Sequence, residues 1–314
     1  MKIFLASFST RVPEDDRPLY QGFLRRHKLR VRELLSYLDA DRAWNSVYKM
    51  RGTRRELMID SGAYSAWTQN KEISLEKYAA FILSHVKAID SVVNLDVIPG
   101  RWGEIPGQKE IDISAERGWE NWEELSKMLA PIYRHPMHVF HQGENFRWLH
   151  RLMDHAEYLG ISPGNDRSPG QKRAWLDEVW QHLCDKQGCP IRKTHGFGVT
   201  SLDLITRFPW TSCDSLTWLL AGRYGHLCIP IGPTLAQIAV STHETAAHHG
   251  RHIRAFSPPE RAAIRHWARR RGFSIEKLAR QPKQRDLFNI LAFCELEQAG
   301  GRNYVKPATQ MTVF

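Results

Sequence analysis

The sequence has few cysteines and no obvious metal-binding pattern. Its 314 residues include five cysteines, an odd number spread over the second half of the chain. They do not form the dense framework that stabilises small secreted domains, so we expect reduced thiols in a cytosolic setting. Cys184 and Cys189 have no second CxxC or HxxxH pair to complete a zinc site. We therefore expect neither a disulfide scaffold nor a metal at this pair.

Long apolar runs, internal repeats and low-complexity segments are also missing. No apolar stretch approaches the roughly 20 residues that cross a bilayer, so we expect no membrane association of that kind. The first residues, MKIFLASFSTRVPEDD, carry one Lys and a short apolar run followed closely by acids. This run is too short for a signal peptide and predicts a first β-strand. A cytoplasmic protein is expected.

Acidic residues are outnumbered by basic ones. The chain has 44 Lys and Arg against 34 Asp and Glu, a net charge of +10. This balance favours a polyanionic partner, usually nucleic acid, although a solvated basic surface without such a role is the alternative. The excess is greatest over residues 251–285, where eleven Arg or Lys accompany two Glu.

From residue 1 to about 231, short β-like runs alternate with amphipathic helical stretches. The predicted strands are 2–8, 56–60, 91–97, 137–142, 158–162, 195–200 and 211–219. The predicted helices include 74–89, 119–132, 147–156 and 171–183. This order predicts a parallel sheet with right-handed crossovers, and seven or eight such units indicate a (β/α)8 TIM-type barrel. Residues 226–231 are the best candidate for the eighth strand.

The sequence changes character from about residue 234 onward. Strand signals become rare and Arg and His become frequent. Ser257-Pro-Pro-Glu260 is typical of a helix start, with Ser as N-cap and Glu at the third position. Gly272 is typical of a helix end, and Ser274 of the next N-cap. We expect a basic helical segment here.

Two domains are therefore predicted: a catalytic barrel at 1–233 and a basic helical C-terminal extension packed on it at 234–314. The two helices around Gly272 have two interpretations. In the favoured one they pack on the barrel wall with Arg facing solvent, and in the other they form a helix-turn-helix that enters a groove. Either surface could hold phosphates.

Polar residues gather where the predicted strands end. In parallel barrels the working residues project from these C-terminal ends. The candidate site residues at these strand ends are Asp60 and Ser61, Asp96, Gln142, Gly160 and Ile161, His195 and Gly196, and Asp214. Taken singly, each has a structural explanation as a turn cap, a strand-end acceptor or a packing residue. Because polar groups inside apolar strands are costly unless paired, their shared position favours a site.

Three aspartates in one pocket suggest chemistry that uses two carboxylates. One ionised Asp can attack an electron-poor carbon while another exchanges protons with the leaving and entering groups. Glycoside chemistry uses such a pair, and a double displacement retains configuration. Carboxylate and amide groups beside an aromatic such as Tyr64 suit a purine.

The strand-end motifs, taken in order, resemble those of a known family. The segments are DSGAY (60–64), NLDV (94–97), HQG (141–143), GISPG (160–164), HGFGV (195–199) and SCDS (212–215). They resemble the active-site motifs of the tRNA-guanine transglycosylase (queuine tRNA-ribosyltransferase) superfamily over about residues 1–225. That resemblance implies a (β/α)8 barrel which exchanges guanine for a 7-deazaguanine base, preQ0- or preQ1-like, without breaking the strand.

The resemblance also implies roles for single residues. Asp214 would be the nucleophile on C1′ of the target nucleoside, and Asp60 the proton carrier for the leaving and entering bases. Asp96 and Gln142 would bind the polar edge of the base. The target base must be flipped or unpaired to reach such a pocket.

Further base-binding positions follow from the same motifs. The backbone of Gly160 and Ile161 would contact the base or its side group, and Tyr64 would stack on it. His195 stands where the family usually has an apolar residue on the other face of the base. The neighbours Ser61 and Gly196 complete the expected base-binding set.

The chain departs from the tRNA enzymes after Asp214. Their CxCxxC motif and downstream His are not reproduced by Cys228 and the later histidines. We therefore expect no zinc and no cofactor. We also expect no counterpart of the additional RNA-binding domain of archaeal members. These features resemble the phage and bacterial DNA-guanine transglycosylases, so DNA is favoured over tRNA as the substrate.

Partners follow from this resemblance and from the charge. We expect DNA, with tRNA as the alternative, and a 7-deazaguanine base; an accessory protein or a homodimer stays open. The setting would be the cytoplasm of a bacterial or phage-infected cell. Phosphate contacts are expected from Arg223, Arg265, Arg269 and Arg270. A non-catalytic nucleic-acid-binding subunit is the alternative of another class, and retention of both Asp60 and Asp214 argues against it.

Overall fold

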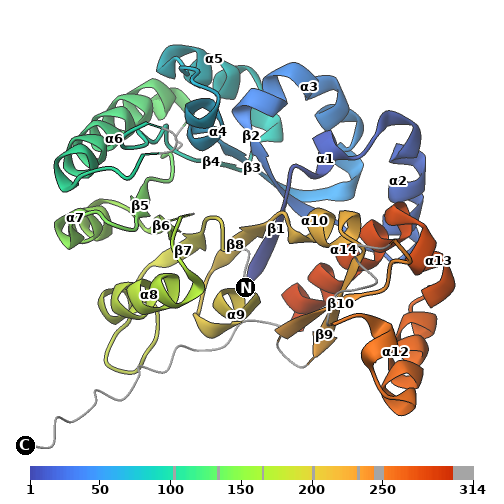
Figure 1. Cartoon of the computed structure of the whole chain (residues 1–314). Coiled ribbons are helices and arrows are strands. Elements are labelled where there is room, and N and C mark those ends of the chain that lie inside the picture. The colour runs from blue at the N-terminus through green and yellow to red at the C-terminus, as the bar shows by residue number, and fades with distance from the viewer. Residues whose placement is uncertain are drawn as a thin grey trace, which may run out of the picture.

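The computed structural model describes residues 1–101, 104–132, 135–164, 166–199, 202–231, 234–243 and 251–299. It is an α/β structure built on eight parallel strands that form a strongly curled sheet (Figure 1). The order across the sheet is β4-β3-β2-β1-β8-β7-β6-β5. The strands are β1 (Lys2–Ala6), β2 (Val31–Ser36), β3 (Arg54–Asp60), β4 (Ser91–Val92), β5 (Val139–His141), β6 (Tyr158–Ser162), β7 (Lys193–Gly196) and β8 (Ser212–Ser215).

The two edge strands of this sheet meet at one point. A single parallel bridge joins Val93, just after β4, to Met137, just before β5. Met137 donates to the carbonyl of Val92 at 2.7 Å, and Asn94 donates to the carbonyl of Met137 at 2.8 Å. The α/β class with a parallel sheet is thus confirmed. The sheet is a curled sheet that is not closed by a continuous ladder between β4 and β5.

Helices cover the outer face of the curled sheet (Figure 1). They are α1 (Phe8–Arg11), α2 (Arg17–Arg26), α3 (Tyr37–Lys49), α4 (Ala63–Thr68), α5 (Leu75–Ser84), α6 (Gln108–Leu129), α7 (Phe146–His155), α8 (Pro169–Leu183), α9 (Leu202–Arg207) and α10 (Thr217–Arg223). Short 3-10 turns lie at Glu14–Asp16, Arg51–Thr53, Val86–Ala88, Ala130–Ile132 and Ile253–Ala255. No helix in the described ranges is long and apolar enough to span a membrane.

Side chains alternate along each strand between the helix layer and the inside of the curl. An inner cluster is formed by Phe4, Leu34, Met58, Val93, Met137 and Val139. Larger clusters between sheet and helices include Leu35, Ile59, Phe140, Leu159, Ile161 and Cys213. Because the period is two, Asp60 and His141 follow Met58 and Val139 on the inner side, at the C-terminal end of the sheet.

The prediction that residues 226–231 form the eighth strand of the parallel sheet is wrong. Residues 226–231 form β9 (His226–Ile231), which pairs antiparallel with β10 (Thr234–Ala239) in a separate two-stranded sheet. The strand that completes the parallel sheet is β2. Its sequence, VRELLS, contains two charged residues, and for this reason the sequence did not indicate a buried strand there. Both charges are paired: Arg32 with Glu56 at 2.9 Å, and Glu33 with Arg54 at 3.2 Å. Residue 200 of the predicted strand 195–200 lies outside the described residues.

The C-terminal segment contains the expected helices, α12 (Pro258–Arg270), α13 (Ile275–Arg280) and α14 (Pro282–Ala299). The predicted capping box at Ser257 is confirmed, because Glu260 accepts from its backbone N–H at 2.8 Å and from its hydroxyl at 2.6 Å. Gly272 follows α12 with φ +82°, a conformation that favours glycine. Ser274 caps α13 by accepting from the Lys277 N–H at 3.2 Å.

This extension shares its core with the sheet. Trp267 and Phe273 pack edge-on against Phe288 of α14, and Phe273 also contacts Phe23 of α2. Such packing agrees with the favoured interpretation, helices laid on the wall. The expected domain boundary at 233 and 234 falls between the paired strands β9 and β10. Residues 244–250 and 300–314 of the predicted extension lie outside the described residues.

Candidate active site

A cavity of about 550 Å³ opens at the C-terminal ends of the parallel strands. It is lined by residues in and just after β3, β5 and β6, by the segments after β4 and β7, and by Asp214 in β8. Six of the predicted site residues line it: Asp60, Ser61, Tyr64, Asp96, Gln142 and Asp214. The fold therefore brings together the three aspartates that the sequence places far apart.

Asp60 ends β3 and is held by the turn that follows it. Its Oδ2 accepts a hydrogen bond from the Gly62 N–H at 3.0 Å. Gly62 has φ +80°, and a Cβ there would lie 2.4 Å from the Ser36 Oγ, so the turn requires glycine. Burial, the nearby Asp96 charge and, more weakly, Asp214 raise the pKa of Asp60 to about 7. The group is therefore poised to exchange a proton near neutral pH.

Asp214 lies on β8 and has different surroundings. Its Oδ1 accepts from the Gly198 N–H at 3.2 Å and lies 3.5 Å from the Nε2 of His195. The side chain is 12% exposed, so an edge of the carboxyl group reaches the cavity. The Gly198 N–H and a ring nitrogen of His195 thus face the same oxygen.

Asp96 and His141 form a charged pair at the cavity wall. The His141 Nε2 lies 3.4 Å from Asp96 Oδ2, and its Nδ1 lies 3.2 Å from Glu144 Oε1. Burial disfavours the imidazolium, but the two carboxylates outweigh it and raise the pKa of His141 to about 10. Asp96 Oδ1 is buried and has no hydrogen-bond partner among the described residues. A buried acceptor of this kind suits a ligand N–H group.

Aromatic side chains stand at the rim and wall of the cavity. Tyr64 on α4 is 42% exposed, and Phe197 lines the cavity just after β7. Trp67 donates from its indole to the Gly100 carbonyl at 2.8 Å, which anchors the segment after β4. Gln142 braces the loop after β6, because its Oε1 accepts from the Gly164 N–H at 3.0 Å.

Four of the predicted base-binding residues do not line the cavity. Gly160 and Ile161 lie within β6, where the Gly160 N–H donates to the His138 carbonyl and the Ile161 carbonyl accepts from Phe197 N–H, both at 2.9 Å. A Cβ on Gly160 would come within 2.8 Å of the Phe197 ring, so this glycine makes room for that ring. Gly196 similarly packs against Val199 and Trp210.

The fourth residue, His195, is fully buried. It therefore presents no face on which a base could stack, and the stacking role expected for it does not fit the structure. Inward-facing residues on β7 recur every second position, so His195 sits one layer deeper than Phe197. The alternating pattern alone gives no depth along the strand, so the sequence could not show that Phe197 and not His195 lines the cavity.

His141, Glu144 and Phe197 are site residues that the predicted set omits. All three line the cavity. His141 is the first residue of the HQG motif at the end of β5 and Glu144 follows that motif, so the clustering of polar residues there was the available signal. Their pairing with Asp96 depends on the approach of β4 and β5, which no local pattern indicates.

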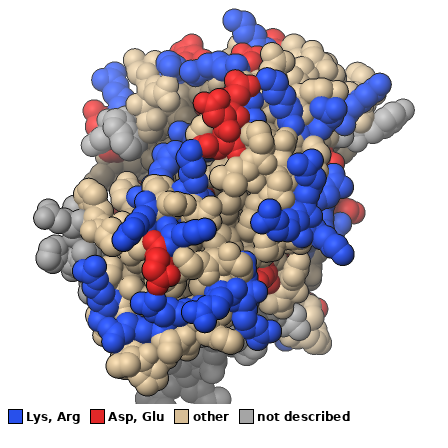
Figure 2. Space-filling model, turned by 90° about the vertical axis from the view of Figure 1, so that its right-hand side faces the viewer, with Lys and Arg blue, Asp and Glu red and all other residues tan. Residues whose placement is uncertain are grey.

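The arginines expected to bind phosphates lie on the outer wall. Arg223 ends α10, and Arg265, Arg269 and Arg270 lie on α12; all four are exposed. Arg265 pairs with Glu276 of α13. Figure 2 shows Lys and Arg side chains spread over the face that α2, α12 and α13 form. None of the four lines the cavity.

No family model and no curated protein matches this sequence. Within the described residues, no group of three or more His, Cys, Asp or Glu side chains is arranged to hold a metal ion. The five cysteines are free thiols. The chemistry of the cavity must therefore be derived from its own geometry and from the motifs that line it.

Proposed function

We propose that this chain is a nucleic-acid guanine transglycosylase that exchanges guanine in DNA for a 7-deazaguanine base. The observation that carries the proposal is the meeting of Asp60, Asp96 and Asp214 in one cavity at the C-terminal ends of the sheet. The ordered motifs that resemble those of the transglycosylase superfamily, and the curled parallel sheet that carries them, support it. Proteins of this architecture place their chemistry at this end.

In the first step, a carboxylate oxygen of Asp214 attacks C1′ of the target nucleoside. The C1′–N9 bond breaks, an ester bond forms to Asp214, and the departing guanine takes a proton from Asp60. With a pKa of about 7, Asp60 is protonated in a substantial fraction of molecules at neutral pH. The nucleic-acid backbone stays intact, because only the glycosidic bond is broken.

In the second step, the now ionised Asp60 takes the N9 proton of the incoming base. The N9 lone pair attacks C1′ and the ester bond to Asp214 breaks, which restores both carboxyl groups. Two displacements at C1′ retain its configuration. A single proton carrier serves both steps because its protonation state alternates.

Recognition of the base falls to Asp96. A guanine-like base presents N1–H and N2–H donors on one edge, and the unpaired Oδ1 of Asp96 is an acceptor that lies ready for them. The protonated His141 pairs with the other oxygen of Asp96 and so leaves Oδ1 for the base. Tyr64 and Phe197 supply aromatic surfaces for the purine plane.

The choice of DNA over tRNA rests on the replacement of the zinc motif by a basic helical extension. Its exposed arginines suit a phosphate backbone in either nucleic acid. The three aspartates line a cavity and not the outer wall, so the target base must leave its stack to reach them. tRNA remains the alternative substrate.

The decisive test is to incubate the protein with a labelled 7-deazaguanine base and either duplex DNA or bulk tRNA. Label should enter DNA, and an Asp214 adduct should be trapped on denaturing gels. Asp214→Asn should abolish both, whereas Asp203→Asn, a change in an exposed ion pair with Arg173, should leave both intact. Label in tRNA alone would overturn the DNA substrate, and label in neither would overturn base exchange.

A further inference from the structure

We propose that His195 is a positioning residue which orients the Asp214 carboxylate for attack, and that Tyr158 and Ser212 fix the tautomer in which it does so. The proposal deepens the transglycosylase function given above and rests on it. Its basis is a line of polar groups beneath the cavity that ends at the nucleophile.

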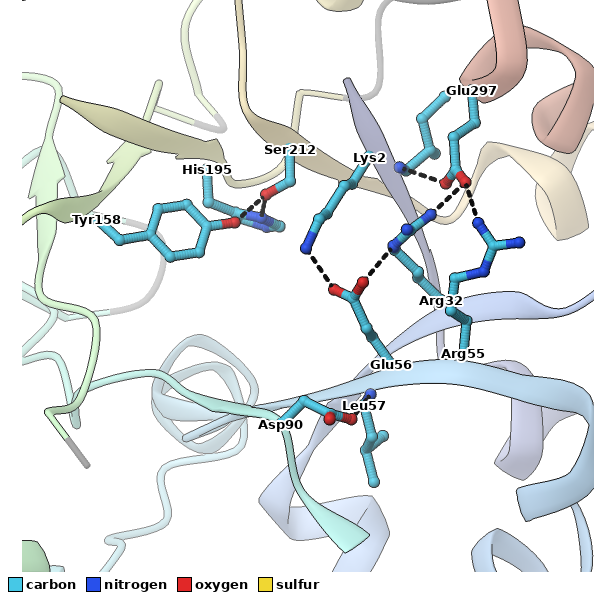
Figure 3. A network of polar contacts seen from close by, with 11 residues as sticks. Lys2, Arg32, Arg55, Glu56, Leu57, Asp90, Tyr158, His195, Ser212 and Glu297 are labelled. Atoms are coloured by element: carbon cyan, nitrogen blue, oxygen red, sulfur yellow. Dashed lines mark hydrogen bonds and ion pairs between the residues drawn. The ribbon is translucent and has the colours of Figure 1, made fainter. Parts of the chain in front are cut away.

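The line runs through three neighbouring strands (Figure 3). The Tyr158 hydroxyl on β6 contacts the Ser212 hydroxyl on β8, and Ser212 Oγ lies 2.5 Å from the Nδ1 of His195 on β7. On the far side of the imidazole ring, Nε2 lies 3.5 Å from Asp214 Oδ1. This buried Nε2 has no hydrogen-bond partner among the described residues, and the Asp214 carboxylate is the polar group it faces.

Chemistry sets the direction of the hydrogens along this line. Burial raises the pKa of Tyr158 to about 12, so the phenol keeps its proton; Ser212 Oγ is its hydrogen-bond partner among the described residues, and we assign Tyr158 as the donor of that bond. Ser212 then uses its own hydrogen to donate to Nδ1 of His195. With Nδ1 acting as acceptor, the neutral ring carries its hydrogen on Nε2, which faces Asp214.

The ring is held in place by packing. His195 and Ser212 are fully buried, and the ring lies against Phe4 and Phe197 with centroid distances of 5.6 and 4.4 Å. In a close-packed interior such a ring does not turn freely. A turned ring would present carbon to Asp214 and would leave Ser212 without its acceptor.

The position and tautomer of His195 determine which oxygen of Asp214 is free to react. Gly198 N–H and His195 Nε2–H both face Oδ1 of Asp214, which leaves Oδ2 free to attack C1′. A neutral imidazole orients the carboxylate without neutralising its charge. The roles are the reverse of those in a Ser-His-Asp triad, where an aspartate orients the histidine.

The kinetic test uses four variants of the full chain: His195→Leu, His195→Gln, Ser212→Ala and Tyr158→Phe. Single-turnover formation of the Asp214 adduct on duplex DNA is measured beside the Kd for guanine base. We expect His195→Leu to slow adduct formation about 100-fold and the two hydroxyl deletions about 10-fold, with Kd unchanged, because a small misplacement of a reacting group has effects of this size. His195→Gln, which restores an N–H donor, should recover part of the rate.

The matched control is Thr53→Val. It also removes a buried hydroxyl, one that donates to the Met50 carbonyl at 2.7 Å, before the N-terminal end of β3. Its rate should equal that of the unchanged chain. Equal rates for His195→Leu and the control would overturn the proposal, as would slowing that is matched by an equal loss of base affinity.

A second measurement needs no activity and so separates this inference from the proposed function. Nitrogen NMR of the unchanged chain should show His195 with an unprotonated Nδ1 and a protonated Nε2, and Tyr158→Phe should lead to a mixture of tautomers. A protonated Nδ1 in the unchanged chain would overturn the inference even if base exchange is confirmed. If base exchange fails while this tautomer is found, the proposed function falls and the positioning of Asp214 stands.

Discussion

Asp60 and Asp214 are the same residue type at the same end of the same sheet, yet their surroundings separate their roles. Asp60 faces the charge of Asp96 in a buried setting, which raises its pKa to about 7. Asp214 instead accepts from the Gly198 N–H and lies beside the His195 ring, which we propose as a second N–H donor. Different environments for paired carboxyl groups are a general way of assigning acid and nucleophile.

A pH dependence follows from this difference. If Asp60 is the proposed proton donor, formation of the Asp214 adduct needs it protonated, so the single-turnover rate should fall about tenfold per pH unit above about 7. Asp96→Asn removes a like charge that raises the pKa of Asp60, so the inflection should move to lower pH. Rapid-quench measurements of both chains across this range test the assignment. An inflection that does not move would show that Asp96 does not act on Asp60.

The sequence alone was sufficient to predict which residues lie at the C-terminal ends of the strands. Asp60, Asp96 and Asp214 could be chosen because carboxyl ends of parallel strands meet at one edge. His195 could not be placed, because a period of two gives the face of a strand but not the depth below the cavity. The His141 pair with Asp96 was also beyond reach, because it depends on how two edge strands approach.

At the scale of elements, charged residues hold the opposite end of the sheet together. Arg32 on β2 pairs with Glu56 on β3 at 2.9 Å and with Glu297 on α14, and Lys2 on β1 pairs with Glu56 at 2.8 Å (Figure 3). Glu297 also accepts from the Ile3 N–H at 2.9 Å. The last long helix is thus attached to the N-terminal ends of the first three strands.

Glu297→Ala should destabilise the fold by about 2–4 kcal/mol, because it leaves the largely buried Arg32 with one acid fewer and the Ile3 N–H without its acceptor. Urea unfolding followed by circular dichroism measures the change. Glu276→Ala, which breaks an exposed pair with Arg265, should cost less than about 1 kcal/mol. Equal effects of the two variants would contradict a role for α14 as a brace.

The elements that the sequence predicted best were those with strong local signals. The capping box at Ser257 and the glycine at 272 gave the ends of α12 correctly, because these signals act within one turn. The sequence did not predict β2, because charged residues such as Arg32 and Glu33 are typical of the protein surface. Their partners, Glu56 and Arg54, are supplied by the neighbouring strand, and only the paired sheet makes the charges tolerable.

At the scale of the whole molecule, the basic surface and the cavity are distinct. Exposed arginines of α12 lie on the outer wall beside α2 and α13, whereas the cavity opens at the strand ends (Figures 1 and 2). Nucleic acid bound by both would contact the wall through its phosphates and the cavity through a flipped base. Affinity and base exchange would then depend on different residues.

This separation can be measured with Arg269→Gln and Arg270→Gln combined. If these exposed side chains contact phosphates, DNA affinity should fall to a similar extent for every sequence, and the slope of log affinity against log salt should decrease by about 2. Lys186→Gln, in the turn after α8, is the control and should change neither quantity. A salt response that is flat in the unchanged chain would exclude a phosphate-binding role for the wall.

The sequence by itself determined the α/β class, seven of the eight parallel strands, the caps of the C-terminal helices and the three aspartates. These follow from short-range periodicity and from residue types at strand ends. The tertiary structure alone decided that β2 completes the sheet, that Asp96 lies between His141 and Asp60, and that His195 sits beneath Asp214. Long-range pairing sets burial and charge proximity, and these give Asp60 and Asp214 their separate characters.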